Sequence, residues 1–319
     1  HYAAEILAVA EVAARTRGAY PVLVSSFQCA PDSFVMDYFK RVMASHNKPY
    51  LILQMDEHSS SVGYETRIEA GIRSFRNHFN RVDRNKLPAY DPVLRPVREK
   101  QLVDKTLVLP NFDRLSLRLV VANLCREGID AMLLEENPVS IQKSLRFNNG
   151  QCIPLNIIAL EFIDFVKARH LDPSRTVLWL PESTIACNIK LYPHHIKSIL
   201  HSYGRGFQNA GVYVGGTSLA DISLKLPINT YFAYMFGGGL RKLGCRIRPY
   251  EKTAGTTDAV IEKSLDILAD AFVGPRSKSA ALADVISLFK GIETRDDPQP
   301  FPRPKVAIFG DLYARDNPN

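Results

Sequence analysis

The sequence lacks several features that would place the protein in a familiar class. It contains no run of about 18 or more uninterrupted apolar residues, so it predicts no membrane-spanning segment, and its first residues lack the order of a secretory signal. No P-loop and no Gly-x-Gly-x-x-Gly motif follows any strand-like run. The triple glycine in MFGGGLRK predicts a helix end or a hinge instead. We expect a cytoplasmic protein without an ATP-binding motif of its own.

The chain also lacks a concentrated block of basic residues. Its 40 Lys and Arg against 33 Asp and Glu give a net charge of +7 and a pI near 9.1, but the cations are scattered and not interleaved with aromatics. This distribution argues against a nucleic-acid partner. It is compatible with an anionic ligand such as a nucleotide-bearing thioester.

Length and patterning indicate the fold class. A chain of 319 residues with 46% apolar residues can form two compact domains. Alternating strand-like and helix-like segments predict an α/β chain of two Rossmann-like or flavodoxin-like domains, with mainly parallel sheets and helices on both faces. A polar segment with three prolines at 83–105 predicts a boundary between domains 1–100 and 101–319. Because the strand-like run at 306–310 comes so close to the end, we expect an excerpt of a longer chain.

The expected elements follow from apolar periodicity. Strands are predicted at 21–27, 50–56, 106–112, 130–134, 176–180, 211–214 and 306–310. Helices are predicted after Cys29, through Ile68 and Ile72, and at 114–126, 139–146, 154–170, 192–203, 227–242, 256–272 and 278–290.

The five cysteines are odd in number and widely spaced, which argues against a disulfide framework. Cys125 falls on the apolar face of a predicted helix, and Cys245 lies in an alternating, strand-like stretch, so both are expected to be buried. Cys29, Cys152 and Cys187 instead each lie on a loop that precedes a helix. A helix N-terminus favours the thiolate, which is the form that binds metal. Three-cysteine metal ligation, a zinc site and unrelated buried thiols all remain open at this point.

Several linked motifs resemble one family. CAPDSFVMDYFKRVM and YLILQMDEHSSSVGYETRIEA are followed by GQCIP, LPESTIACNIKLY, RIRPYEKTAGTTD and VAIFGDLYARDNP. In this order they resemble the activase-related branch of the 2-hydroxyacyl-CoA dehydratase and double-cubane cluster family, over most of residues 19–318. At the third cysteine this chain departs from the family's Gly-Pro-Cys-Arg-Phe-Gly-x-Tyr, because it has Ile-Ala-Cys-Asn-Ile-Lys-Leu-Tyr at 185–192.

The resemblance implies a [4Fe–4S] cluster held by Cys29, Cys152 and Cys187. Three thiolates leave one iron open to substrate, to water or to a sulfide shared with a second cubane, which would make an [8Fe–9S] double cubane. It further implies a partner or fused activator of the acetate/sugar kinase and heat-shock chaperone type, which hydrolyses ATP and reduces the cluster. An acyl-CoA or another small molecule would be the substrate, and the chain could be oligomeric.

Other polar residues are candidates for the same site. His58 follows a buried strand and has the pKa range of a proton donor, although it could equally fix its own loop. Glu65 is a second catalytic candidate and Arg67 a substrate-binding one; both could instead form a structural ion-pair network. Arg248 and Tyr250 of RPYE, predicted at a strand end, could contact an anionic substrate, with domain packing the favoured interpretation.

Three functions follow from these expectations. The first is an iron–sulfur electron-transfer or reductase component that is driven by a partner ATPase under anaerobic conditions. The second is direct dehydration or reduction of an acyl-CoA at the open iron. The third is a structural or regulatory domain without a cluster, which the altered loop at Cys187 favours.

Overall fold

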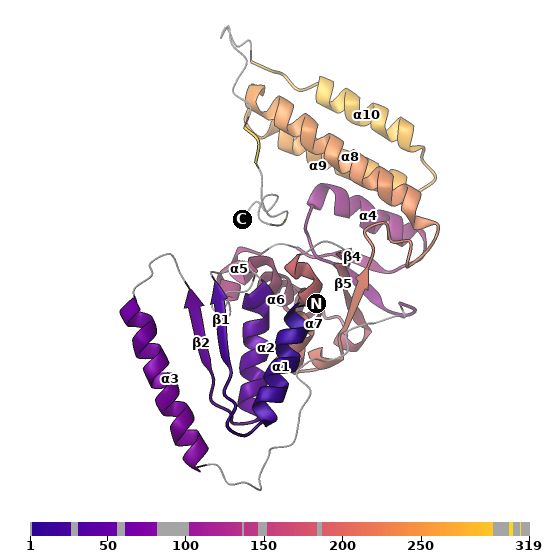
Figure 1. The fold of residues 1–319 in the computed structure, drawn as a ribbon. Helices are drawn as coiled ribbons and strands as arrows, with labels where there is room; N and C mark the ends of the chain where they lie inside the picture. The colour runs from indigo at the N-terminus through magenta and orange to yellow at the C-terminus, as the bar shows by residue number, and fades with distance from the viewer. Residues whose placement is uncertain are drawn as a thin grey trace.

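The computed structural model describes most of the chain. Its described residues are 2–26, 31–55, 61–81, 102–135, 137–145, 152–183, 187–295, 306–308 and 313. They form two lobes, an N-terminal lobe within 2–81 and a C-terminal lobe within 102–295 (Figure 1). The predicted boundary falls in 82–101, which lies outside the described residues.

Strands and helices alternate in both lobes. The N-terminal lobe contains α1 (Tyr2–Arg15), β1 (Val22–Ser26), α2 (Pro31–Ser45), β2 (Leu51–Met55) and α3 (Ser61–Arg81). The sheet of the C-terminal lobe is built from β3 (Thr106–Leu109), β4 (Ala131–Leu133), β5 (Thr176–Pro181) and β6 (Gly211–Gly215). Its α-helices are α4 (Arg114–Arg126), α5 (Pro138–Leu145), α6 (Ile153–Ala168), α7 (Tyr192–Tyr203), α8 (Leu226–Ile247), α9 (Thr256–Val273) and α10 (Lys278–Lys290). Short 3-10 helices are η1 (Pro173–Arg175), η2 (Asn188–Leu191), η3 (Phe207–Asn209) and η4 (Arg248–Tyr250).

The N-terminal lobe is a parallel strand pair between helices. β1 and β2 are aligned with Val22 opposite Leu51. Leu23 and Ile52 point to one face, where they pack with apolar residues of α1 and α2. On the other face Gly71 of α3 lies against Leu51, where an added methyl group would be 3.2 Å from the Leu51 side chain. Helices therefore cover both faces, as the sequence predicts.

The sheet of the C-terminal lobe is parallel, with strand order β4-β3-β5-β6. Because side chains alternate along a strand, Leu107 and Trp179 face one core, shared with α4, α8, α9 and α10. Val108 and Leu178 face a second core, shared with α6 and α7. The predicted α/β fold with parallel sheets and helices on both faces is confirmed.

The triple glycine at 237–239 does not end a helix. It lies within α8, where Gly237 is buried and faces the first turn of α4. A methyl group added at Gly237 would be 2.7 Å from both Cα and N of Ser116. Glycine is therefore required at this position because two helix backbones approach each other closely.

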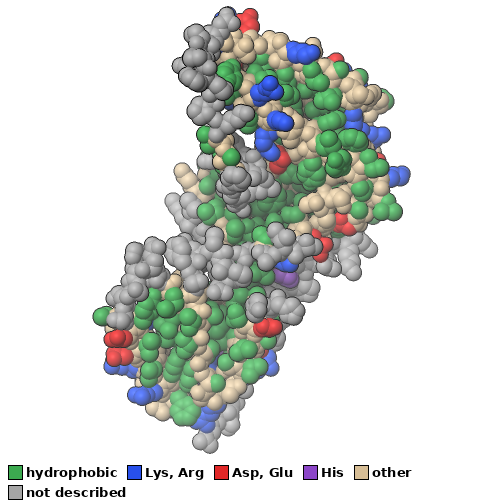
Figure 2. All heavy atoms as spheres, turned by 45° about the horizontal axis from the view of Figure 1, so that its top comes forward, with side chains coloured by type: hydrophobic (Ala, Val, Ile, Leu, Met, Phe, Trp, Pro, Cys, Tyr) green, Lys and Arg blue, Asp and Glu red, His purple; other side chains and the backbone are tan. Residues whose placement is uncertain are grey.

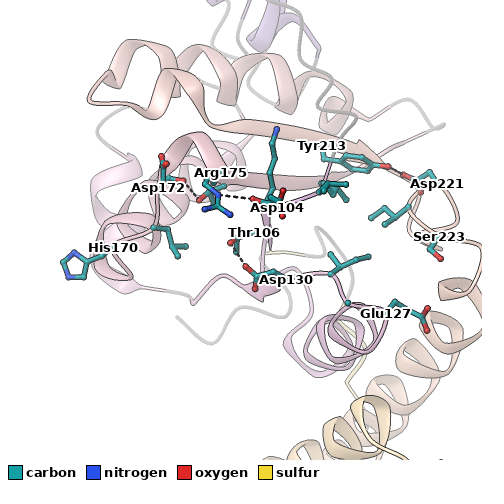
Figure 3. Close-up of a pocket in the computed structure, with 18 residues that line it drawn as sticks. Asp104, Thr106, Glu127, Asp130, His170, Asp172, Arg175, Tyr213, Asp221 and Ser223 are labelled. Atoms are coloured by element: carbon teal, nitrogen blue, oxygen red, sulfur yellow. Dashed lines mark hydrogen bonds between the residues drawn. The ribbon is translucent and has the colours of Figure 1, made fainter.

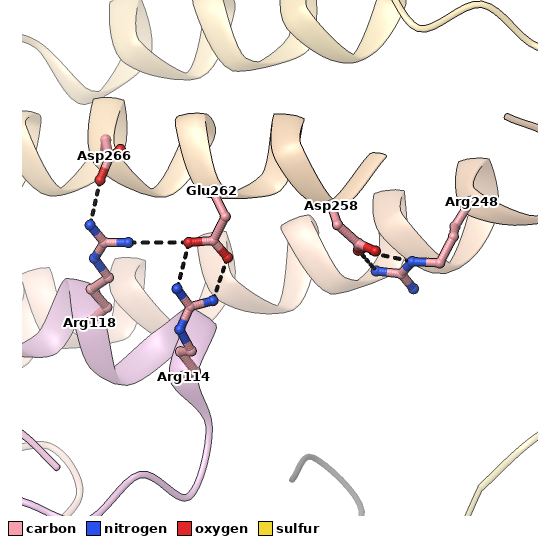
Figure 4. Close-up of polar contacts among 6 residues, drawn as sticks. All are labelled: Arg114, Arg118, Arg248, Asp258, Glu262 and Asp266. Atoms are coloured by element: carbon pink, nitrogen blue, oxygen red, sulfur yellow. Dashed lines mark hydrogen bonds and ion pairs between the residues drawn. The ribbon is translucent and has the colours of Figure 1, made fainter. Parts of the chain in front are cut away.

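Ion pairs tie α4 to α9 on the side away from the sheet. Arg114 pairs with Glu262, and Arg118 pairs with both Glu262 and Asp266 (Figure 4). At the start of α4, Asp113 caps the helix by accepting from the Ser116 backbone N–H at 3.3 Å, and it also accepts from Arg241 of α8 at 2.6 Å. These contacts fix the start of α4 against α8 and α9.

Several local predictions are wrong. Residues 306–308 of the expected strand at 306–310 are not in a strand, and Val306 and Ile308 are 84% and 69% exposed. The stretch around Cys245 is the last turn of α8, and the RPYE segment forms η4 after a helix rather than a strand end. The helices predicted from the sequence do not include α1.

No helix within the described ranges combines the length and apolar character that a membrane crossing requires.

Candidate metal centre

Cys152 is the N-cap residue of α6. Pro154 lies in the first turn, and the Leu155 backbone N–H donates to the Cys152 carbonyl at 3.1 Å. The Cys152 side chain is half-buried and makes no capping hydrogen bond. Its sulfur is therefore placed at a helix start, where the helix dipole and exposed N–H groups favour a thiolate.

Cys187 occupies the equivalent position before η2, which runs directly into α7. Its backbone is extended, with φ −126° and ψ 143°, and its carbonyl accepts from the Lys190 N–H at 3.4 Å. The side chain is exposed and, like that of Cys152, makes no capping hydrogen bond. The altered sequence around this cysteine therefore still presents a thiol at the start of a helical segment.

The starts of three helices meet beside these cysteines. Phe34, in the first turn of α2, stacks on Tyr192, the first residue of α7, with ring centroids 5.9 Å apart. Both rings belong to the second core of the C-terminal lobe, and Cys152 packs against that core. Helices that connect parallel strands begin at the carboxyl edge of the sheet. Both described cysteines therefore lie at this edge, where α2 of the N-terminal lobe packs against the C-terminal lobe (Figure 1).

Cys29 and His58 lie outside the described residues. In the sequence, Cys29 comes two positions before Pro31, the first residue of α2. Phe34 of that helix is fully buried in the apolar core against which Cys152 packs. The first turn of the helix that follows Cys29 is thus placed beside the other two cysteine-bearing segments.

The donor set fits an iron–sulfur cluster better than a disulfide. Cys152 and Cys187 are not in disulfides, and each lies at a helix N-terminus that offers N–H donors to a sulfide. No group of three or more His, Cys, Asp or Glu side chains arranged for a metal ion occurs among the described residues. A [4Fe–4S] cluster at this edge would need Cys29 as a third protein thiolate.

A buried histidine and a buried tyrosine lie where α2 of the N-terminal lobe packs on α7. His195 of α7 is 5% exposed and contacts the rings of Phe34 and Tyr38 edge-on. Burial lowers the pKa of His195, an effect that the Asp37 carboxylate opposes and the Arg41 guanidinium reinforces. Burial likewise raises the pKa of Tyr38 to about 12. Both side chains are therefore neutral at pH 7 at the contact between the lobes.

The lowered pKa of His195 predicts an acid-sensitive contact. The unfolded chain binds this proton near pH 6.5 and the folded chain only at lower pH, so stability is full above about pH 6.5 and falls below it, by at most about 1.4 kcal/mol per pH unit. Replacing His195 with Gln should remove that part of the pH dependence of the unfolding free energy, measured by urea denaturation between pH 5 and 8. His201→Gln, at an exposed site on the same helix, is the control. Equal pH dependence in wild type and His195→Gln would refute the assignment.

A buried carboxylate lies on the neighbouring helix. Glu161 of α6 is 2% exposed; it accepts from the Tyr313 hydroxyl at 3.3 Å and from the Asn137 backbone N–H at 3.4 Å. Tyr313 also packs edge-on against Phe112, which follows β3. Sequence reasoning missed these residues. The available signal was a single Glu within the apolar run LNIIALEFIDFV of α6.

The other predicted site residues are not brought together. Glu65 and Arg67 are exposed on α3, whereas Arg248 and Tyr250 lie in η4, which follows α8, far from α3 in the fold (Figure 1). Arg248 donates from Nε to Oδ1 of Asp258 at 3.0 Å and so ties η4 to α9. Glu65 and Arg67 lie near the start of α3, whereas Arg248 and Tyr250 lie in η4 after α8, so the two pairs do not share one site.

The RPYEKTAGTTD motif has a structural explanation. The Glu251 carboxylate accepts from the backbone N–H groups of Gly255 and Thr257, both at 2.7 Å, at the start of α9. Hydrogen bonds from Thr257 and from the Gly255 backbone N–H lower the pKa of this carboxyl. The Glu251 of this motif therefore stabilises the start of α9.

The prediction that Cys125 and Cys245 are buried is wrong, because both are exposed. Cys125 lies at the end of α4, where its thiol donates to the Ala131 carbonyl at 3.7 Å. Cys245 lies on the outer side of α8, opposite the buried Gly244 and Leu240. Neither packs against the apolar core that contains Phe34 and Tyr192 and that Cys152 contacts.

A hollow of about 930 Å³ opens at the opposite edge (Figure 3). Its lining comes from segments that precede β3, β4 and β5, together with Tyr213 and Asp221. Three of the carboxylates there have structural partners: Asp130 accepts from Thr106, Asp221 accepts from Tyr213, and Asp172 caps η1. The hollow is separate from the cysteine-bearing edge.

No family model, curated protein or solved structure matches this chain.

Proposed function

We propose that the chain binds a [4Fe–4S] cluster through Cys29, Cys152 and Cys187 and transfers low-potential electrons within an ATP-dependent reductase system. The observation that carries the proposal is the placement of Cys152 and Cys187 at helix starts on one sheet edge, beside the first turn of α2. Helix N-termini from both lobes would then surround one cluster.

Bound there, the cluster would supply one-electron chemistry with one iron free of protein thiolate. The residues of the chain would hold and shield it. Phe34 and Tyr192 are buried aromatic residues of one apolar core, and Ile189 and Leu191 of η2 pack against that core. Such surroundings disfavour the more charged reduced state, whereas N–H groups at the helix starts stabilise it. The midpoint potential is therefore the quantity that distinguishes a low-potential carrier.

ATP hydrolysis is assigned to another protein or to another part of a longer chain. The sequence contains neither a P-loop nor a Gly-x-Gly-x-x-Gly motif after a strand. An activator of the acetate/sugar kinase and heat-shock chaperone type would supply that step. Its docking close to the lobe contact would bring its electron donor to the cluster.

A redox titration tests this function. The protein is purified and reconstituted without oxygen, then titrated with Ti(III) citrate while visible absorbance and electron paramagnetic resonance are followed. We expect a midpoint potential below about −400 mV, at the low end of the range for such clusters. A cluster that is reduced above about −200 mV would contradict the low-potential function but leave the metal site intact.

A further inference from the structure

Helix α8 has a second apolar face that no described part of the chain covers. Its inner face is buried against α4 and α9, with Leu226, Thr230, Ala233, Gly237, Leu240 and Gly244 spaced four and three residues apart. The outer face carries Ile228, Tyr231 and Met235, which are 73%, 63% and 52% exposed. Leu224, just before the helix, is 87% exposed. Figure 2 shows hydrophobic side chains gathered on the surface of this part of the molecule.

The outer face changes character halfway along the helix. After Met235 the same face continues with Gly239, Lys242 and Arg246. A methyl group added at Gly239 would have no atom within 4 Å, so the backbone is open to an approaching surface. Residues 226–247 contain no Asp or Glu. The face thus has a bulky apolar half, a flat centre and a basic half.

We propose that this outer face pairs with the same face of a second copy of the chain, with the two α8 helices antiparallel and crossing between Met235 and Gly239. The two halves of the face are then complementary. The bulky half of each helix lies against the glycine and basic half of the other, as an isologous interface requires.

Antiparallel pairing also keeps the basic ends of the two helices apart. Lys242 of one copy lies over the Phe232 ring of the other, a cation–π contact, and Arg246 extends along the other copy's Ile228. A parallel pair would place Lys242 beside Lys242 and Arg246 beside Arg246. Since the helix has no acidic residue to offset that repulsion, the parallel arrangement is disfavoured.

The size of the face predicts a reversible dimer. A helix of 22 residues is about 33 Å long, and pairing two such faces buries on the order of 1,000 Å² in total, at the low end for specific interfaces. Concentration-dependent association is therefore expected. The pairing is independent of the cluster, because α8 lies on the opposite side of the sheet from α6 and α7.

Sedimentation equilibrium over a range of protein concentrations tests the proposal. Wild type should fit a monomer–dimer equilibrium, and Ile228→Glu and Met235→Glu should weaken association at least tenfold. Ile286→Glu makes the same change at a 43% exposed residue of α10 and should leave association unchanged. Circular dichroism of each variant establishes that it is folded. A monomeric wild type, or a dimer insensitive to both α8 changes, would overturn the proposal.

Oxidative cross-linking tests the direction of the pair. In the antiparallel arrangement the two Met235 Cα atoms are close, whereas the two Cys245 residues are about 24 Å apart along the helix axes. Met235→Cys should therefore form a covalent dimer on mild oxidation, and wild type should form none through Cys245. Cross-linking of wild type that is lost in Cys245→Ala would establish a parallel pair and refute this one.

Discussion

Replacing Gly237 with Ala is expected to lower the free energy of unfolding by about 2 kcal/mol, the usual effect of overpacking. The added methyl group would meet Ser116 backbone atoms at 2.7 Å, and backbone cannot move aside as a flexible side-chain end can. Helix propensity acts the other way by about 1 kcal/mol, because alanine favours a helix interior over glycine. The steric cost should prevail. Urea denaturation at one fixed protein concentration measures the difference.

Gly238→Ala is the matched control in the next position of the same helix. A methyl group at Gly238 has no atom within 4 Å, so only propensity acts and the variant should be about 0.5–1 kcal/mol more stable than wild type. The two neighbouring substitutions should therefore have opposite signs. If Gly237→Ala were as stabilising as Gly238→Ala, the close packing of α8 on α4 would be wrong.

Cys152→Ala and Cys187→Ala are each expected to abolish the visible absorbance of the cluster after anaerobic reconstitution. Each removes one of three thiolates, and a cubane left with two protein ligands is not retained. Cys29→Ala should have the same effect. Visible absorption spectra of the reconstituted proteins, at equal protein concentration, measure the loss.

Cys125→Ala and Cys245→Ala are the controls, because both thiols are exposed and neither packs against the apolar core that Cys152 contacts. They should retain the full absorbance. Loss of absorbance in Cys245→Ala, or its retention in Cys187→Ala, would show that the ligand set is wrong. The second outcome would also favour the interpretation of the altered loop at Cys187 as a lost ligand.

The strands and most helices of the described fold could be predicted because their signal is local. Short apolar runs such as TVLWLP form buried parallel strands, and the helices between them carry a clear apolar period. The segments Cys-Ala-Pro at 29–31 and Cys-Ile-Pro at 152–154 carry a local signal of the same kind. Proline in the first turn marks a helix start, as Pro154 of α6 does.

The wrong predictions concern segments whose environment lies far away in the sequence. KLGCRIRPYE alternates like a strand, but it continues the long helix α8 and packs through Gly244 on Ile261 of α9. The triple glycine looked like a helix end, whereas contact with Ser116 explains Gly237. Tertiary packing overrides local preference in both places.

The surroundings of the candidate metal centre could not be predicted from the sequence. His195 and Tyr38 become neighbours only because α2 packs on α7, and Glu161 meets Tyr313 from more than a hundred residues away. Nothing local to these residues distinguishes them from ordinary helix positions. The proposed ligands thus rest on sequence motifs, whereas the buried polar groups near them became apparent only from the fold.

The most direct test of the metal centre is the iron and acid-labile sulfide content of the wild-type chain after anaerobic purification and reconstitution. We expect about four irons and about four sulfides per chain. Near-zero iron and sulfide in a protein that circular dichroism shows to be folded would contradict it and leave Cys29, Cys152 and Cys187 without a role in metal binding.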